Sequence, residues 1–264
     1  MTAALAAATH TGAEALALGP ILLPCDFSTA TAASIRAAAI LAGRFGAEIV
    51  ALHVIPSPLP ASGGFRALPN PILLRARLHD DLKRALDGAL EPARADAVVA
   101  RAEQREGKPA DEILALCSAM DAGLIVIGTH GRRAIDRALV GSVAETVLRR
   151  ATCPVLAVPP FFAAEAEWPR TVLWANERSS DVGAALAYAS AIAAKAGAAL
   201  VPARGVAPRS ILGLARRCGA DLVVLGASRP GRIRRVLPRS AVLAIVREAP
   251  CPVLVVRRLV APAS

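Results

Sequence analysis

Four small residues that follow an apolar run carry the strongest sign of chemistry in this sequence. Gly128, Gly131, Gly141 and Ser142 come after Leu124–Ile127, and Ser142 opens a stretch with amphipathic helical spacing. Glycines let main-chain N–H groups approach an anion without a Cβ in the way, and a helix N-terminus adds further N–H groups. The spacing predicts a phosphate-binding loop, the glycine loop (residues 128–142); an ordinary turn with a helix cap is the alternative.

Three polar side chains inside the glycine loop have less specific roles. His130 is interpreted as an exposed loop residue rather than a catalytic base, because no carboxylate is placed to orient it. Arg132 and Arg133 either reach a bound phosphate or are solvated charges. The sequence therefore predicts no catalytic residue and no metal ligand here.

Strand and helix patterns alternate along the first 160 residues, and this alternation predicts a parallel α/β sheet covered on both faces. The predicted strands cover residues 21–24, 48–54, 97–103, 124–127 and 155–158, and the predicted helices cover residues 29–45, 72–90, 110–120 and 142–150. Residues 57–71 are rich in Pro, Gly and Ser, which predicts a mobile loop.

An internal repeat divides the chain into two copies of one unit. Residues 152–158 recur as 250–256, and Leu124–Gly128 recurs as Leu222–Gly226. The second copy is about 53 residues shorter, which is enough for one helix and one strand, so we expect about four strands in it. Loss of a covering helix would leave an apolar sheet face, and we expect residues 161–168, the first copy or a second chain to cover it.

With Ile21–Ser28 and Leu52–Ile55, the glycine motif resembles the ATP-binding branch of the universal stress protein family, over about residues 19–258. The resemblance implies two doubly wound, parallel-sheet, Rossmann-like domains, the second truncated. The implied division is a flexible tail (1–18), a nucleotide-binding domain (19–160), a linker (161–169), a shortened degenerate domain (170–258) and a second tail (259–264).

The resemblance also implies a site and a mode of association. In such sheets a ligand binds where the strand order reverses, here between the first and fourth strands. The positions that match the family's nucleotide site are Pro24, Asp26, Val54, Ile127, Gly128, Gly131, Gly141, Ser142 and Val143. Asp26 would meet the nucleoside, or else be a helix N-cap shared with Ser28. Family members commonly pair through the last strand, so Val155–Val158 is expected beside Val253–Val256 as a pseudo-dimer, and whole chains could form a homodimer.

The second copy departs from this pattern at the site. Asn176 replaces Asp26, Arg229 falls where Gly131 would, and Arg239 replaces Gly141, while Gly226 and Ser240 are kept. An arginine would occupy the phosphate position, so we expect no ATP binding of the family's kind there. A smaller anion could bind among Arg229, Arg232, Arg234, Arg235 and Arg239.

Composition limits the partners. The net charge is +10, and residues 161–264 contribute +9 of it (15 Lys and Arg against 6 Asp and Glu). Such a surface attracts nucleic acid, acidic lipid or acidic protein. Only 3% of residues are aromatic and no nucleic-acid-binding motif is present, which argues against nucleic acid. No apolar run reaches the roughly 18 residues of a membrane span.

Cysteine usage predicts a reducing, cytoplasmic setting. Five cysteines without a C-x-x-C motif argue against a disulfide framework and against a zinc site. Cys153 and Cys251 are interpreted as buried structural thiols. Cys25, beside the implied nucleotide, is the cysteine we would suspect of sensing.

These features predict a regulatory protein that binds ATP with magnesium and signals through conformational or partner changes. AMP or another adenine nucleotide is an alternative ligand, and the protein partner is unknown. A basic adaptor or anion-binding protein with a vestigial nucleotide site is one alternative function. A slow ATPase is another, although an enzyme would need a general base and an acidic metal ligand that the motif does not supply.

Overall fold

A computed structural model describes most of the chain. The described residues are 16–56, 80, 84, 87–88, 90–91, 98–129, 140–176, 182–204, 207–227 and 239–257. The predicted loop 57–71, Gly131 with His130, Arg132 and Arg133, and the arginines from 229 to 235 lie outside this set. Most of the predicted helix 72–90 lies outside it too, and residues 80, 84, 87–88 and 90 of that segment are helical.

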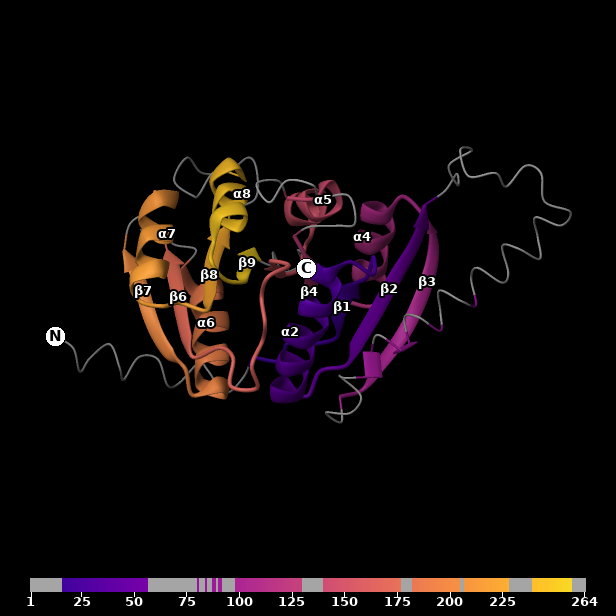
Figure 1. Cartoon of the computed structure of the whole chain (residues 1–264), viewed down its shortest axis with the longest axis horizontal. Helices are drawn as coiled ribbons and strands as arrows, with labels where there is room; N and C mark the ends of the chain where they lie inside the picture. The colour runs from indigo at the N-terminus through magenta and orange to yellow at the C-terminus, as the bar shows by residue number, and fades with distance from the viewer. Residues whose placement is uncertain are drawn as a thin grey trace, which may run out of the picture.

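Nine strands among the described residues form one continuous sheet (Figure 1). They are β1 (Ile21–Pro24), β2 (Ile49–Pro56), β3 (Ala100–Gly107), β4 (Leu124–Gly128), β5 (Val155–Val158), β6 (Thr171–Asn176), β7 (Ala199–Arg204), β8 (Leu222–Ala227) and β9 (Val253–Arg257). Their order across the sheet is β3-β2-β1-β4-β5-β9-β8-β6-β7. All neighbours are parallel except β5 and β9, which run antiparallel.

The β5–β9 ladder joins the two copies, which we call the first half (β1–β5) and the second half (β6–β9). Leu156 lies opposite Leu254, so the expected pairing of the two last strands is confirmed. The described second half has four strands, as the shortened repeat predicts. The α/β parallel-sheet fold class is likewise confirmed.

Helices cover both faces of the sheet, because strand residues alternate between two apolar faces. The helices are α2 (Thr29–Phe45), α4 (Pro109–Ala119), α5 (Ser142–Arg150), α6 (Val182–Ala196), α7 (Pro208–Arg217) and α8 (Arg239–Glu248). In Figure 1, α2 and α6 lie on one face, the α2 face, and α4, α5, α7 and α8 lie on the other, the α4 face. Each face has one core to which both halves contribute.

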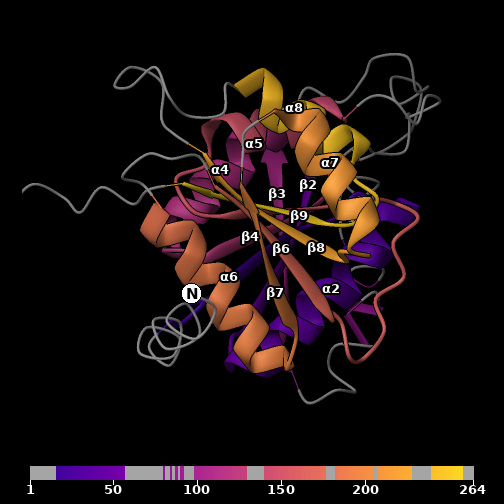
Figure 2. The ribbon, with the colours of Figure 1, turned by 90° about the vertical axis from the view of Figure 1, so that its left-hand side faces the viewer.

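The twist of the sheet is visible from its second-half edge (Figure 2). The helices that follow β1 and β6 end in the same way, since Gly46 and Gly197 have φ of 66° and 65° after α2 and α6. This left-handed conformation favours glycine. No helix in the described part of the chain combines the length and apolar character that crossing a bilayer requires.

The predicted boundaries of β3 and of the N-terminal tail differ from the structure. The strand predicted over 97–103 is β3, Ala100–Gly107, which pairs with β2 from Ile49–Ala100 to Pro56–Gly107. β3 is an edge strand of mostly polar residues, so its partner and not an apolar pattern sets its ends. Leu18, the last residue of the predicted N-terminal tail, is 1% exposed in the α2-face core, so the folded unit includes it.

The linker segment (residues 161–169) packs onto the α2 face. Phe162 contacts Trp168 edge to face, and Trp168 is buried in the core that α2 and α6 share. The Trp168 Nε1–H donates to the Asp221 carbonyl at 2.8 Å. The linker segment therefore contributes to the core on this face beside α2 and α6, and the expectation that it covers the surface left by the missing helix stays a prediction.

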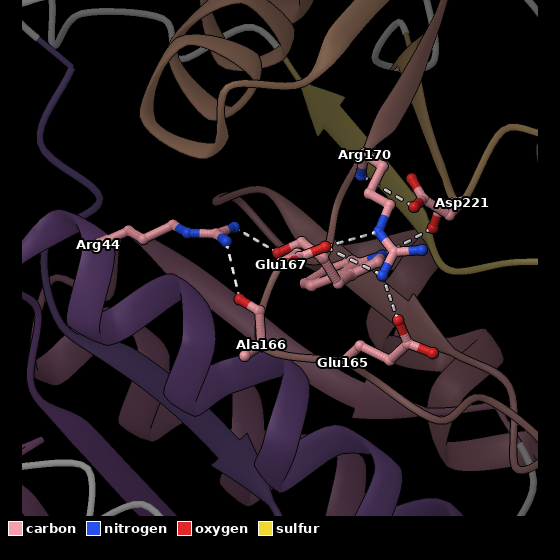
Figure 3. Close-up of polar contacts among 7 residues, drawn as sticks. Arg44, Glu165, Ala166, Glu167, Arg170 and Asp221 are labelled. Carbon is pink, nitrogen blue, oxygen red and sulfur yellow. Dashed lines mark hydrogen bonds and ion pairs between the residues drawn. The ribbon is translucent and has the colours of Figure 1, made fainter.

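Polar contacts fasten the linker to both halves (Figure 3). From α2, the Arg44 guanidinium donates to the carbonyls of Ala166 and Trp168. On the other side, both carboxylate oxygens of Asp221 accept main-chain N–H groups, from Arg170 at 2.9 Å and from Thr171 at 3.0 Å. The Arg170 side chain pairs with Glu165 and Glu167.

Candidate functional site

The strand order reverses between β1 and β4, as the resemblance implies. The β1–β4 ladder pairs Ile21 with Leu124 and Leu22 with Ile125, and it ends there. β1 continues beside β2 to the Pro24–Leu52 pair, and β4 continues beside β5 to the Gly128–Val158 pair. Beyond Leu22 and Ile125, the two central strands are therefore unpaired on the sides that face each other. This fork at the carboxyl ends of the strands is where doubly wound sheets bind ligands.

Main-chain bonds fix both ends of the glycine loop at this fork. The Thr129 N–H donates to the Val158 carbonyl at 2.9 Å, and the Gly141 N–H donates to the Thr129 carbonyl at 2.7 Å. Thr129 is buried, so the loop begins and ends on a rigid base. The structure thus brings Gly128 together with Gly141 and Ser142, whereas Gly131 lies outside the described residues.

Helix α5 begins at this base with N–H groups that no side chain caps. Its N-cap is Gly141, with φ −58° and ψ 144°, and the Gly141 carbonyl accepts the Glu145 N–H at 2.8 Å. Ser142 is exposed at the first helical position and Val143 is half-buried behind it. An uncapped helix N-terminus with a hydroxyl beside it has the donors that an anion needs.

Gly128 is required by packing. A Cβ built on Gly128 would lie 2.7 Å from the Ala30 Cβ in the first turn of α2. Contacts under about 3.0 Å do not occur between real Cβ atoms, and α2 therefore sits against the end of β4 only because residue 128 has no side chain. This close packing explains the glycine whether or not a phosphate binds near it.

Asp26 organises the start of α2. Its Oδ1 accepts the Ser28 N–H at 3.0 Å and the Thr31 hydroxyl at 2.9 Å. The Thr31 hydroxyl oxygen in turn accepts the Asp26 N–H at 3.3 Å. Ser28 is the N-cap by position but its side chain makes no capping bond. The helix-start role weighed for Asp26 is thus present, through an Asx-type turn that leads into the helix.

Two neighbours of Asp26 were not predicted as site residues. Phe27 has a left-handed backbone, φ 60°, and its ring centroid lies 5.0 Å from that of His53. His53 Nδ1 lies 2.7 Å from the Cys25 carbonyl oxygen, which can only accept, so Nδ1 carries a proton. Both rings are half-buried at the end of β1. The sequence places an aromatic residue directly after the strand-end aspartate, but it gives no sign that this residue meets His53.

Of the remaining predicted residues, Val54 offers main-chain groups to the site, whereas the main-chain groups of Ile127 face β5. Val54 and Ile127 are 8% and 5% exposed, with side chains in the α4-face core, while Pro24 is half-buried. The Leu52 carbonyl accepts the Cys25 N–H at 2.8 Å. Main-chain groups two residues apart in a strand point to the same side, so those of Val54 face the same side as those of Leu52, towards β1. The last β1–β2 pair is Pro24 with Leu52, so the main-chain groups of Val54 lie beyond the end of that ladder.

Cys25 is a poor candidate for sensing. It is 5% exposed, and its thiol donates to the Leu23 carbonyl at 3.4 Å. Burial, with a smaller contribution from the Asp26 charge, raises the pKa of Cys25 to about 12. The reactive thiolate is therefore scarce near neutral pH, and the hypothesis that this cysteine senses anything is not supported.

The second half differs at the corresponding positions. A Cβ built on Gly226 would meet the Ala185 Cβ at 3.5 Å, an ordinary contact, so the close packing seen at Gly128 is absent there. Asn176 ends β6, and Arg239 opens α8 where Gly141 precedes α5. Among the described residues, no group of three or more His, Cys, Asp or Glu side chains could hold a metal ion.

The comparisons with known proteins all point to one family. The family model described as universal stress protein family matches residues 18–159 and 201–257. A universal stress protein of Methanocaldococcus jannaschii is 36% identical over 142 residues, which are 52% of this chain and 80% of that protein. Universal stress protein A homolog 1 of Coxiella burnetii is 30% identical over 138 residues, 52% of this chain and 94% of that protein.

One solved structure matches nearly the whole chain. The crystal structure of a universal stress protein from Archaeoglobus fulgidus aligns with a TM-score of 0.72 at 20% identity, over 92% of this chain and 99% of that one. This likeness shows that the arrangement of both halves is shared.

Proposed function

Because the chain belongs to the universal stress protein family, a stress-response class, we propose that its first half binds an adenine nucleotide, ATP with magnesium foremost, and acts as a regulatory switch. The observation that carries this proposal is the fork between β1 and β4, with the uncapped N-terminus of α5 at its end. AMP or another adenine nucleotide fits the same proposal.

The phosphates belong at the glycine loop. The main-chain N–H groups at the start of α5 and the exposed Ser142 hydroxyl supply donors, and the helix dipole favours negative charge there. Gly128 keeps the end of β4 free of a side chain, and Gly141 does the same at the helix start. Magnesium usually binds through substrate phosphates with few protein ligands, so it would arrive with ATP.

The nucleoside belongs at the other arm of the fork. The outward main-chain groups of Val54 can pair with the adenine edge, whereas those of Ile127 face β5, as do those of Ile125 and Thr129 on either side of it. Phe27 and His53 add half-buried ring surface beside them. Asp26 would meet the ribose while its Oδ1 holds the start of α2, so a bound nucleoside and the α2 N-terminus would be coupled through one carboxylate.

A binding role fits this set of residues better than an enzymatic one. Hydrolysis of ATP needs a group that positions water and an acidic ligand for the metal near the γ-phosphate. The described ends of the glycine loop contribute glycines, Thr129, Ser142 and main-chain groups, which bind phosphate without activating water. We therefore expect any ATP hydrolysis by this protein to be too slow to be its function.

The test is calorimetric titration of ATP with magnesium into the full chain and into two matched variants. Gly141→Arg installs the residue that the second half has at this position, and its φ of −58° accepts any side chain, so the backbone is not strained. We expect one site with Kd of about 1 μM in the wild type and a loss of at least about 100-fold in Gly141→Arg. Gly128→Ala is avoided because its Cβ would meet Ala30.

Arg239→Ala is the control, because it changes the corresponding residue of the second half. It is expected to bind ATP as the wild type does. Binding that survives Gly141→Arg would place the phosphates elsewhere than α5, and binding lost in Arg239→Ala alone would move the site to the second half. No binding by the folded wild type would contradict the proposal outright.

A basic adaptor is the second candidate, favoured by the outer helices of the second half. Arg209, Arg216, Arg217 and Arg247 are exposed on α7 and α8. A partner held by this surface would be acidic, and its binding would weaken steeply with added salt. Capture that is independent of ATP and released by salt would favour this function over the nucleotide switch.

A further inference from the structure

Two cysteine thiols touch inside the first half. The Sγ atoms of Cys117, near the end of α4, and Cys153, in the turn before β5, lie 3.2 Å apart. Both residues are buried in the α4-face core, with 3% and 5% of their surface exposed. Both are free thiols in the structure.

We propose that Cys117 and Cys153 are a redox site, which forms a reversible disulfide when the protein meets a peroxide. A disulfide needs its sulfur atoms at about 2.05 Å, so closure requires an approach of about 1.1 Å, which small side-chain rotations can supply. The site does not depend on nucleotide binding.

The reaction balances with the peroxide as a two-electron oxidant. The Cys117 sulfur attacks one peroxide oxygen, the O–O bond breaks, and the other oxygen leaves as water after taking a proton. This step gives Cys117 a sulfenic acid. The Cys153 sulfur then attacks the Cys117 sulfur, the S–O bond breaks, and the hydroxyl leaves as a second water with the Cys153 proton. Two thiols are oxidised to one disulfide, and one peroxide is reduced to two waters.

The contact also decides which thiol reacts first. The hydrogen bond between the two thiols lowers the pKa of Cys117, while that bond and burial raise the pKa of Cys153. Cys117 is therefore the better nucleophile, and Cys153 is held against it as the resolving thiol. Because both are buried, the peroxide must enter by local opening of α4.

The other three cysteines lack this arrangement. Cys25 donates to the Leu23 carbonyl at 3.4 Å, and Cys218 donates to the Ala215 carbonyl at 3.8 Å. Cys251 is the counterpart of Cys153, 98 residues later, but the counterpart of Cys117 at the same spacing is the buried Ala215. Burial raises the pKa of Cys251 to about 12, with smaller contributions from Asp221 and Cys218. The second half thus has a counterpart of Cys153 but none of Cys117.

The position of the pair gives the disulfide a consequence. Residues 117 and 153 enclose β4, the glycine loop and α5. A disulfide would close a covalent ring around the segment that carries the phosphate donors, and would restrict how far α5 can move from α4. The oxidation state of the pair would therefore affect the candidate site, because the disulfide would restrain the segment that carries the phosphate donors.

The experiment maps cysteine oxidation in the full chain. Reduced, folded protein is treated with an excess of hydrogen peroxide, denatured, alkylated with N-ethylmaleimide and digested with trypsin, which separates all five cysteines onto different peptides. The expected product is a cross-link between peptides 106–132 and 151–170 that dithiothreitol reverses, while the cysteines at 25, 218 and 251 remain alkylated.

Two variants test the geometry. Cys117→Ala copies the second half and should abolish the cross-link. Ala215→Cys copies the first half and should add a new cross-link between peptides 210–216 and 248–257. The wild-type result stands even if the buried Ala215→Cys variant fails to fold. Full alkylation of Cys117 and Cys153 after peroxide, or an equal yield of a link between Cys218 and Cys251, would overturn the proposal.

Discussion

The two halves build one sheet and have corresponding helices, but they differ in the residues near the ends of those helices and strands. A spacing of 98 residues relates them from α4 to β5, so each position in that stretch of the first half has a counterpart in the second. Gly141 corresponds to Arg239, Cys117 to Ala215 and Gly123 to Asp221. The core positions are apolar in both, whereas these edge positions differ in chemistry. The comparison teaches that one framework tolerates different chemistry at the ends of its elements.

The Gly123 and Asp221 pair shows how a single position came to serve different contacts. A Cβ built on Gly123 would lie 1.6 Å from the Leu18 carbonyl oxygen, because the chain before β1 passes directly over it. At Asp221 the chain before β6 runs differently, and the carboxylate accepts the N–H groups of Arg170 and Thr171. One half closes this end of the sheet by main-chain contact and the other by a side chain.

Exchanging the first of these residues should have the largest effect. Gly123→Asp is expected to leave little folded protein, at a cost above about 4 kcal/mol, because main chain and not a flexible side chain blocks the Cβ. Thermal unfolding monitored by circular dichroism measures it. Gly88→Ala is the matched control, since a Cβ there would meet nothing within 4 Å. A normally folded Gly123→Asp protein would contradict this account of the first half.

Removing the second-half carboxylate should cost less. Asp221→Ala leaves two main-chain N–H groups without their charged acceptor, and we expect a loss of about 2–3 kcal/mol in the free energy of unfolding. Urea unfolding measures this loss. Glu167→Ala is the control, because its ion pair with the same Arg170 is exposed and should contribute about 0.5 kcal/mol or less. Equal effects of the two changes would mean that Asp221 does not anchor the linker.

A high-pH experiment tests what the halves have in common. The pKa values of Cys25, in the first half, and Cys251, in the second, are raised from 9.0 to about 12, mainly by burial. Their contribution to stability is complete below pH 9 and is lost as the pH rises towards 12, since the unfolded thiols ionise first. At pH 10.5 each thiol should have lost about 2 kcal/mol of stabilisation.

Urea unfolding under reducing conditions at pH 8 and 10.5 measures this loss. Cys25→Ala and Cys251→Ala should each flatten the pH dependence by a similar amount, whatever their effect at pH 8. A slope unchanged in both variants would show that neither thiol is buried as the structure has it.

The sequence predicted the elements of this fold well where apolar periodicity was strong. The repeat of Leu124–Gly128 at 222–226 predicted β4 and β8, and the repeated last strand predicted the β5–β9 pairing. β3 begins three residues and ends four residues later than predicted, because an edge strand with polar residues takes its ends from its partner. Leu18 was assigned to a tail because local composition does not reveal that a segment packs against the core.

The candidate site was predictable only as far as its motif extends. The glycine spacing pointed to the start of α5 and to the end of β4, and the structure brings these together. The packing of Gly128 against Ala30 and the contact between Phe27 and His53 join residues distant in sequence. Nothing local signals such contacts. The same holds for Cys117 and Cys153, which are separated by 36 positions and meet only because α4 crosses the turn before β5.

The smallest effect is expected at the outer helices, where corresponding positions of the two halves carry opposite charges. In the first half Arg150, the last residue of α5, pairs with Asp111 in the first turn of α4 at 2.6 Å. Their counterparts are Glu248, at the end of α8, and Arg209, at the start of α7. The helix dipole favours the first arrangement at both ends and disfavours the second at both.

Exchanging the charges should therefore act in opposite directions in the two halves. Asp111→Arg with Arg150→Glu keeps a possible pair but reverses both dipole interactions, so we expect a loss of about 1 kcal/mol. Arg209→Asp with Glu248→Arg should gain about 0.5–1 kcal/mol in the second half for the same reason. Both double variants leave the net charge unchanged, and both effects should shrink in concentrated salt. If urea unfolding shows that both exchanges change the free energy of unfolding in the same direction, the dipole argument fails. Arg209 and the other arginines of α7 and α8 must then be explained by what they bind and not by their small effect on stability.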